Sequence, residues 1–223
     1  KFERRLPAAQ RFILERGLNQ RVAGNGGRFG IVLQGGTYGV VLRALRLLGA
    51  ADAFGRTSVP LLVLNVIHPL VPAEIREFLA GKDSVLVVEE GNPALIEQQL
   101  HALAHEMRVP CRVHGKDMLP IAGEYVGDVV RAGIARYLAT TGGSIGGVAS
   151  RQVVAAESES SRARAALNQP VPARPPGFCT GCPERPVFTA LKLLERERGP
   201  LHISSDIGCS TFSTQPPFNM GNT

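Results

Sequence analysis

The hydrophobic residues of this chain follow two alternating patterns before about residue 140. Short continuous runs of Val, Ile and Leu are separated by longer segments in which apolar residues recur every three or four positions. A continuous run predicts a strand buried on both faces, and the three-to-four spacing predicts an amphipathic helix. The strands that we expect are residues 30–34, 60–66 and 84–89, with an edge strand at 111–114. The helices that we expect are residues 7–16, 38–48, 72–79, 93–106 and 127–138.

This alternation of strands and helices predicts an α/β fold in which a mostly parallel sheet has helices on both faces. Glycine and proline mark the boundaries of the units. Gly35 and Gly36 follow the first strand, and Pro72 and Pro93 stand at the starts of two helices. We therefore assign residues 1–138 to one α/β domain.

The pattern stops between residues 139 and 176. Residues 142–147 are rich in glycine, and residues 170–176 contain four prolines. Such a composition predicts a linker that is semi-rigid at its proline end. A second domain is expected over residues 177–223, truncated after its first elements. Those elements are a helix at 185–198, a strand at 201–204 and, at the carboxyl end of that strand, a loop at 206–209, where α/β domains usually bind ligands.

The composition argues against several classes of protein. The formal net charge is +6, but the basic residues are dispersed among glutamates and form no run interleaved with aromatic residues, so we expect no nucleic-acid partner. No apolar run approaches the roughly 20 residues that span a bilayer, and the N-terminus has no signal-peptide core. We therefore expect a cytoplasmic protein that does not bind membranes. Four cysteines in such a compartment fit a metal or redox role better than a disulfide framework.

Three features of the first domain have both a chemical and a structural interpretation. The glycine-rich turn at 35–39 offers amides to a phosphate, but it matches neither the P-loop nor the dinucleotide pattern, so a tight strand-to-helix turn is favoured. Glu89 and Glu90 follow a buried strand and are a candidate acid/base pair, although helix capping or an interface role is favoured. His101 and His105 have the spacing of metal ligands but no third ligand, which favours a solvated helix face.

The cysteines of the second domain are the residues hardest to explain by packing. Cys179 and Cys182 form a CxxC motif, and Cys209 stands on the later loop. Two thiolates at this spacing can hold one corner of a zinc or iron–sulfur site, with a third ligand from a distant loop. The motif follows a proline-rich linker instead of a βαβ unit, which disfavours a thioredoxin-like redox pair. Buried, unreactive cysteines are the alternative.

Five runs of residues occur in the same order as in a known enzyme family. They are FGIVLQGGTYGVVLRAL at 29–45, SVLVVEEG at 84–91, FCTGCPERP at 178–186, FTALK at 188–192 and SDIGCSTF at 205–212. The first two resemble the transketolase C-terminal-like domain of 2-oxoacid:ferredoxin oxidoreductases, and the last three resemble the start of their thiamine-diphosphate domain. The most similar branch is the large, or alpha, subunit of indolepyruvate ferredoxin oxidoreductase. The resemblance covers nearly the whole chain.

The resemblance implies a reaction that composition and spacing do not show. An aryl 2-oxoacid would be oxidatively decarboxylated, its electrons would pass through iron–sulfur clusters to ferredoxin, and its acyl group would be transferred to coenzyme A. The implied cofactors are thiamine diphosphate with magnesium and a [4Fe–4S] cluster. The implied partners are a smaller beta subunit and ferredoxin, in an oligomeric assembly.

The resemblance also implies roles for particular residues. Cys179, Cys182 and Cys209 match three cysteines that ligate a cluster in the pyruvate-acting relatives, which makes them candidate cluster ligands here. For the indolepyruvate branch, lining of the thiamine pocket is the alternative. Glu184 matches a thiamine-contacting position of the pyruvate enzymes, at which many indolepyruvate relatives have His.

By the same likeness, Asp206, Gly208 and Cys209 belong to the loop that faces the cofactor. The resemblance points to no catalytic residue within these runs.

Several parts of such an enzyme are missing from the sequence. It contains no GDG-to-Asn segment to hold magnesium and diphosphate, no pyrimidine-binding domain with an activating Glu, and no ferredoxin-like run of cysteines. It begins at Lys1 and ends soon after a Pro-Pro turn. We therefore expect a fragment that is catalytically inactive on its own. The alternatives are a docking module with a structural zinc at the CxxC motif, and an enzyme specific for pyruvate or branched-chain acids.

Overall fold

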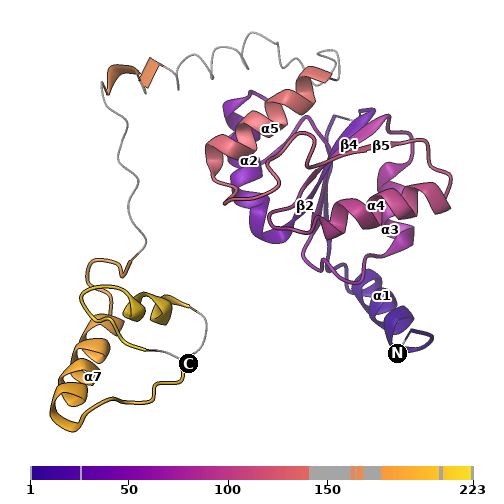
Figure 1. Cartoon of the computed structure of the whole chain (residues 1–223). Helices are drawn as coiled ribbons and strands as arrows, with labels where there is room; N and C mark the ends of the chain where they lie inside the picture. Colours follow the sequence, from indigo (N-terminus) through magenta and orange to yellow (C-terminus); the bar gives the residue numbers. More distant parts are fainter. Residues whose placement is uncertain are drawn as a thin grey trace. The chain divides into compact units, whose positions relative to one another are not determined.

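The computed structural model (Figure 1) describes residues 2–25, 27–140, 162–163, 165–167, 177–205 and 208–221. The chain divides into two compact units, residues 1–166 and residues 167–223. Most of the predicted linker lies outside the described residues, as does Asp206 of the predicted site. The predicted domain boundaries at 138 and 177 therefore stay predictions.

A five-stranded sheet forms the centre of the first unit. Its strands lie in the order β1 (Gln20–Val22), β3 (Leu61–Leu64), β2 (Phe29–Gln34), β4 (Ser84–Val88) and β5 (Arg112–His114). All neighbours are parallel except β1, which runs antiparallel to β3. In the middle of the sheet, Val32 of β2 lies opposite Leu62 of β3 and Val87 of β4. The predicted α/β fold with a mostly parallel sheet is confirmed.

Helices cover both faces of this sheet (Figure 1). Helices α2 (Tyr38–Leu47) and α5 (Gly127–Thr140) cover one face, and α3 (Pro72–Leu79) and α4 (Leu95–Glu106) cover the other. Successive side chains of a strand point to opposite faces. Ile31 and Leu33 of β2 therefore pack with α2 and α5, and Val32 between them packs with α3 and α4. This explains why the strands are continuous apolar runs.

Helix α1 (Arg5–Glu15) and strand β1 precede the part of the sheet that the apolar pattern predicts. Sequence analysis missed β1 because its three residues include one apolar side chain, Val22. The strand is held by contacts with distant residues: Arg21 donates a hydrogen bond to the carbonyl of Glu74 at 2.8 Å, and Asn19 donates to the Glu74 carboxylate at 2.7 Å. The other predicted elements of the first unit are all present, with ends that differ by up to two residues.

The order in which strands are added to the sheet reverses between β2 and β4, so the topological switch point lies at the carboxyl ends of these two strands. The chain leaves β2 to form β3 on one side and later forms β4 on the other side. After β2, η1 (Gly35–Thr37) leads directly into α2, so the predicted tight turn is confirmed. A Cβ atom at Gly35 would lie 2.5 Å from Oδ1 of Asn65, so a larger residue would clash there.

The second unit is organised by α7 (Glu184–Arg198) and η2 (Cys209–Thr214). Four phenylalanines pack together, with ring centroids 5.4 Å to 6.0 Å apart: Phe178, Phe188, Phe212 and Phe218. The predicted helix at 185–198 is confirmed, but the predicted strand at 201–204 is wrong. Ile203 is the one residue of that segment with a β-bridge in the described structure. A strand needs a partner along its whole length to pair its backbone groups.

Within the described ranges, no helix combines the length and the apolar character that crossing a bilayer requires.

His114, the last residue of β5, forms a polar contact with Asp117. Nδ1 of His114, a buried residue, lies 2.6 Å from Oδ2 of Asp117, and the Gly115 amide donates to Oδ1 at 2.8 Å. Partial burial raises the pKa of Asp117, but the hydrogen bonds from His114 and Gly115 outweigh it and lower the pKa below its ordinary value.

This lowered pKa predicts a loss of stability in acid. A carboxyl group whose pKa is lower in the folded state stabilises the fold above its unfolded pKa and loses this contribution as the pH falls through the folded pKa. Replacing Asp117→Asn should therefore destabilise the protein at pH 7, and the difference from wild type should shrink below about pH 4. Urea unfolding between pH 7 and pH 3 would measure this. Glu124→Gln, at an exposed carboxylate, is the control, and a difference independent of pH at position 117 would contradict the prediction.

Candidate functional site

The CxxC motif forms a turn immediately before α7. The amide of Cys182 donates to the carbonyl of Cys179 at 3.2 Å, and Gly181 between them has a φ of +73°, which glycine tolerates far better than other residues. Arg185 closes the turn, because its guanidinium donates to the Phe178 carbonyl at 2.7 Å. The motif is therefore held by the helix that follows it.

The three cysteines of the predicted site are all free thiols. Cys179 and Cys209 are exposed, and Cys182 is half-buried. Cys209 begins η2, directly after Gly208. In the part of the chain that the structure describes, no three His, Cys, Asp or Glu side chains come together in a group able to hold a metal ion. The structure thus places two thiols on one turn and does not bring Cys209 to them.

Glu184 is the first residue of α7, and its carboxylate lacks a complete set of partners. Its Oε2 atom is buried and accepts no hydrogen bond within the described structure. A buried acceptor without a donor costs about 1–3 kcal/mol. The described residues thus supply no hydrogen-bond donor for this oxygen of Glu184.

In the first unit, the carboxyl edge of the sheet is occupied by the chain's own polar groups. The carboxylate of Glu89, which follows β4, accepts hydrogen bonds from the amides of Ile96 at 2.9 Å and 3.0 Å and of Glu97 at 3.1 Å. These amides belong to the first turn of α4 and have no partner within the helix. The favoured interpretation of Glu89 as a helix cap is confirmed.

Lys116 connects β4 to the loop that follows β5. Its Nζ atom donates to the carbonyl of Glu89 at 2.6 Å and to the hydroxyl of Tyr125 at 2.7 Å. Glu90 completes the connection, because its carboxylate accepts from the Tyr125 amide at 2.6 Å and its amide donates to Gln34 at 2.9 Å. Hydrogen bonds therefore connect the ends of β2, β4 and β5.

The electrostatics of this edge follow from burial. Burial lowers the pKa of Lys116, although three nearby carboxylates counteract the shift. Burial and the same carboxylates raise the pKa of Tyr125 to about 12, so its hydroxyl stays protonated and donates to the Pro120 carbonyl at 2.6 Å. The carboxylates are those of Glu89, Glu97 and Glu90. These hydrogen bonds hold the loop between β5 and α5 in place.

Three histidines of the first unit have different surroundings. His101 and His105 are exposed on α4, in agreement with the predicted solvated face. His114 is buried against Tyr137, with ring centroids 5.7 Å apart.

Comparison with known proteins gives a consistent result. The sequence profile of the indolepyruvate oxidoreductase domain matches residues 19–135. That match covers more than half of the chain, from β1 into α5.

The chain belongs to the indolepyruvate oxidoreductase family.

Three relatives in this family illustrate how much of the chain is shared. Subunit IorA of indolepyruvate oxidoreductase from Methanothermobacter thermautotrophicus is 31% identical over 202 residues, which cover 88% of this chain and 28% of that protein. The Thermococcus kodakarensis subunit is 30% identical over 197 residues, covering 88% and 27%. The Archaeoglobus fulgidus subunit is 32% identical over 193 residues, covering 86% and 27%.

The chain spans less than a third of the length of these indolepyruvate oxidoreductase relatives. No solved structure matches it significantly.

The residues that hold this edge of the indolepyruvate oxidoreductase domain were largely missed by sequence analysis. Lys116 and Tyr125 lie in an irregular loop, where no periodic pattern singles them out. The one available signal was that Lys116 follows an edge strand, and hence reaches the same sheet edge as Glu89.

The capping role of Glu89 leads to a stability prediction. Glu89→Ala should lower the free energy of unfolding by about 1–3 kcal/mol, because buried amides of α4 lose their acceptor. Glu89→Gln retains one acceptor oxygen and should lose less. Urea unfolding of this chain would measure both. Glu15→Ala, at an exposed position of α1, is the control, and a Glu89→Ala variant as stable as wild type would contradict the assigned cap.

Proposed function

We propose that this chain is part of the large subunit of an oxidoreductase that oxidatively decarboxylates aryl 2-oxoacids such as indolepyruvate. The observation that carries the proposal is the match of residues 19–135 to the indolepyruvate oxidoreductase domain, together with relatives that align over most of the chain. The relatives are named as subunits, which supports a partner subunit for this chain as well. The products would be acyl-CoA, carbon dioxide and reduced ferredoxin.

The second unit would contribute one wall of a thiamine diphosphate site. Thiamine diphosphate, with magnesium, supplies the decarboxylation chemistry in enzymes that bind it. The buried Oε2 of Glu184, which has no partner among the described residues, supports this assignment, because it needs a hydrogen-bond donor and thiamine carries an amino group on its pyrimidine ring. We propose Glu184, Asp206, Gly208 and Cys209 as the residues that line this wall.

We assign Cys179, Cys182 and Cys209 as candidate ligands of a [4Fe–4S] cluster. The turn that fixes Cys179 and Cys182 has the spacing of one corner of such a site, but the three thiols form no metal-binding group within the described residues. The residues present therefore do not fit a complete cluster site by themselves. Lining of the thiamine pocket is the alternative role for these thiols.

The substrate class is tested by steady-state kinetics. In the intact enzyme, with coenzyme A and ferredoxin, kcat/KM for indolepyruvate and phenylpyruvate should exceed that for pyruvate by at least about tenfold, because the pocket must reject an analogue that lacks the ring. The 223-residue chain alone should show no turnover, because it carries one wall of the cofactor site. A preference of the intact enzyme for pyruvate or branched-chain acids would overturn the proposal.

The role of the cysteines is tested by metal analysis of the intact protein. Cys182→Ser should reduce iron content per subunit if the thiol ligates a cluster. Cys111→Ser is the matched control: Cys111 is also half-buried, lies in the first unit, and has a pKa raised by burial to about 11, so its thiol is protonated. Unchanged iron with impaired thiamine binding would indicate pocket lining. Zinc in place of iron would favour a structural site, and no change in metal or binding would refute both roles.

A further inference from the structure

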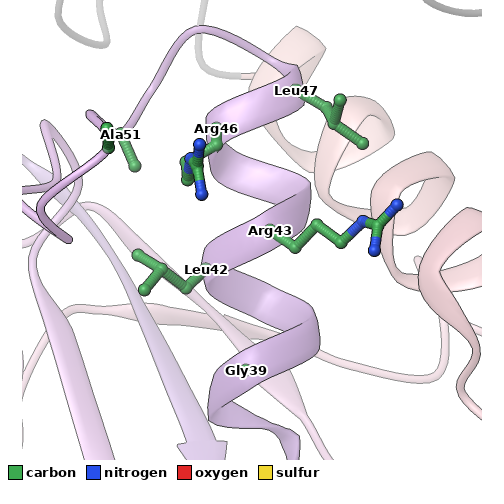
Figure 2. Close-up of a pocket in the computed structure, with 7 residues that line it drawn as sticks. Gly39, Leu42, Arg43, Arg46, Leu47 and Ala51 are labelled. Carbon is green, nitrogen blue, oxygen red and sulfur yellow. The ribbon is translucent and has the colours of Figure 1, made fainter.

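The outward face of α2 is hollowed on both sides. One hollow, of about 620 Å³, lies between α2 and the segment at 51–53, and a second of the same volume lies between α2 and the start of α5. Gly39, Arg43 and Leu47 border both hollows. Figure 2 shows Arg43 and Leu47 projecting to one side of α2 and Arg46 with Leu42 to the other. Residues 43, 46 and 47 follow residue 39 by four, seven and eight positions, so all four lie on the outward face of α2. Arg43 and Arg46 stand on the two sides of that face (Figure 2).

Three arginines at this face have no ion-pair partner in the part of the chain that the structure describes. Arg43 and Arg46 are exposed on α2, and Arg56 is exposed beside an adjoining hollow that shares Ala51. None of these three guanidinium groups forms an ion pair within the described residues. The carboxylate of Asp52, which borders the same hollow as Arg56, accepts hydrogen bonds from the backbone amides of Phe54 and Arg56. Asp128, which borders the second hollow, pairs with Arg131 at 3.4 Å. Among the described residues, the face thus presents three guanidinium groups without an ion pair.

Apolar side chains are exposed among these arginines. Phe54 is 91% exposed at the tip of the turn next to α2, and Leu47 is 56% exposed on the helix. Val126, which borders the second hollow, is 48% exposed. Leu47 and Val126 border the hollows, and Phe54 follows in the segment whose Gly55 lies beside Leu42 of α2. Exposed large apolar residues that cluster in this way mark an interaction surface more often than a free surface.

Gly39 adds an independent observation. It lies in the first turn of α2 with an ordinary φ, and a Cβ atom built there would meet nothing within 4 Å. Glycine is a poor helix former, so a residue with a side chain would stabilise α2. Nothing in the described structure would clash with a side chain at position 39. A glycine here therefore suits a surface that another molecule approaches closely.

We propose that the α2 face, defined by Gly39, Arg43, Arg46, Leu47 and Phe54, docks an acidic amphipathic helix of another polypeptide. The apolar ridge of that helix would contact Leu47 and Phe54 and fill the hollows beside α2, and its carboxylates would pair with the arginines. Close approach at Gly39 would let the two helices cross there. A second copy of this chain is disfavoured, because a two-fold contact through this face would bring the same arginines together.

Photo-crosslinking of the intact enzyme locates the occupant. A photoreactive p-benzoylphenylalanine in place of Leu47 should cross-link to a peptide of another polypeptide that is acidic and has apolar residues at helical spacing. The same group in place of Leu95, which is 54% exposed on the opposite face of the sheet, is the matched control and should not give that product. A cross-link to a second copy, to the same subunit, to a nucleic acid or to a peptide without acidic residues would overturn the proposal, as would the absence of any product.

Charge reversal measures the contribution of the arginines. Arg43→Glu should weaken the association of the intact enzyme's subunits about tenfold and reduce its dependence on salt concentration. Arg76→Glu, exposed on α3 at the opposite face, should change the affinity less than about twofold. Leu47→Ser tests the apolar contact in a variant with unchanged charge, and circular dichroism verifies its fold. Equal effects of Arg43→Glu and Arg76→Glu would show that the α2 face is not the docking site.

Discussion

The central strand β2 is the element on which the first unit depends. It pairs in parallel with β3 on one edge and β4 on the other, and its side chains alternate between the two hydrophobic clusters. Fully burying an aliphatic side chain contributes about 1.5–3 kcal/mol, so Ile31, Val32 and Leu33 together stabilise both faces of the sheet. All four covering helices lie against clusters to which this strand contributes.

At the carboxyl edge of the sheet, polar residues hold the strand ends and the adjoining helix and loop in place. In many α/β domains this edge binds a ligand. Here the Glu89 carboxylate caps α4, and Lys116 and Tyr125 fasten the following loop. The hydrogen bonds of these three side chains therefore hold the domain together. The second unit holds the thiols of Cys179, Cys182 and Cys209 and a Glu184 oxygen that has no partner among the described residues. The arginines that form no ion pair among the described residues lie on α2 and on the segment after it. The thiamine site and the docking face that we propose lie on surfaces other than this edge.

The candidate site could be predicted from the sequence only in part. The CxxC motif is local, so its turn and its helix follow from Gly181, Pro183 and the apolar positions of α7. The distance from that turn to Cys209 depends on contacts beyond the motif, and no spacing rule supplies it. Lys116 illustrates the same difficulty, because its two hydrogen-bond partners lie 27 and 9 residues away in the chain.

The sequence by itself determined the α/β class, the parallel core and nearly all of its helices and strands, because each depends on a periodic pattern within a few residues. Its motifs also pointed to the family, through their order along the chain. The tertiary structure alone decided that Gln20–Val22 forms an edge strand, that residues 201–204 do not form a strand, and that Glu89 serves α4. The physical reason is the same in each case: backbone and carboxylate groups take partners that are distant in sequence, and local pattern does not record where those partners lie.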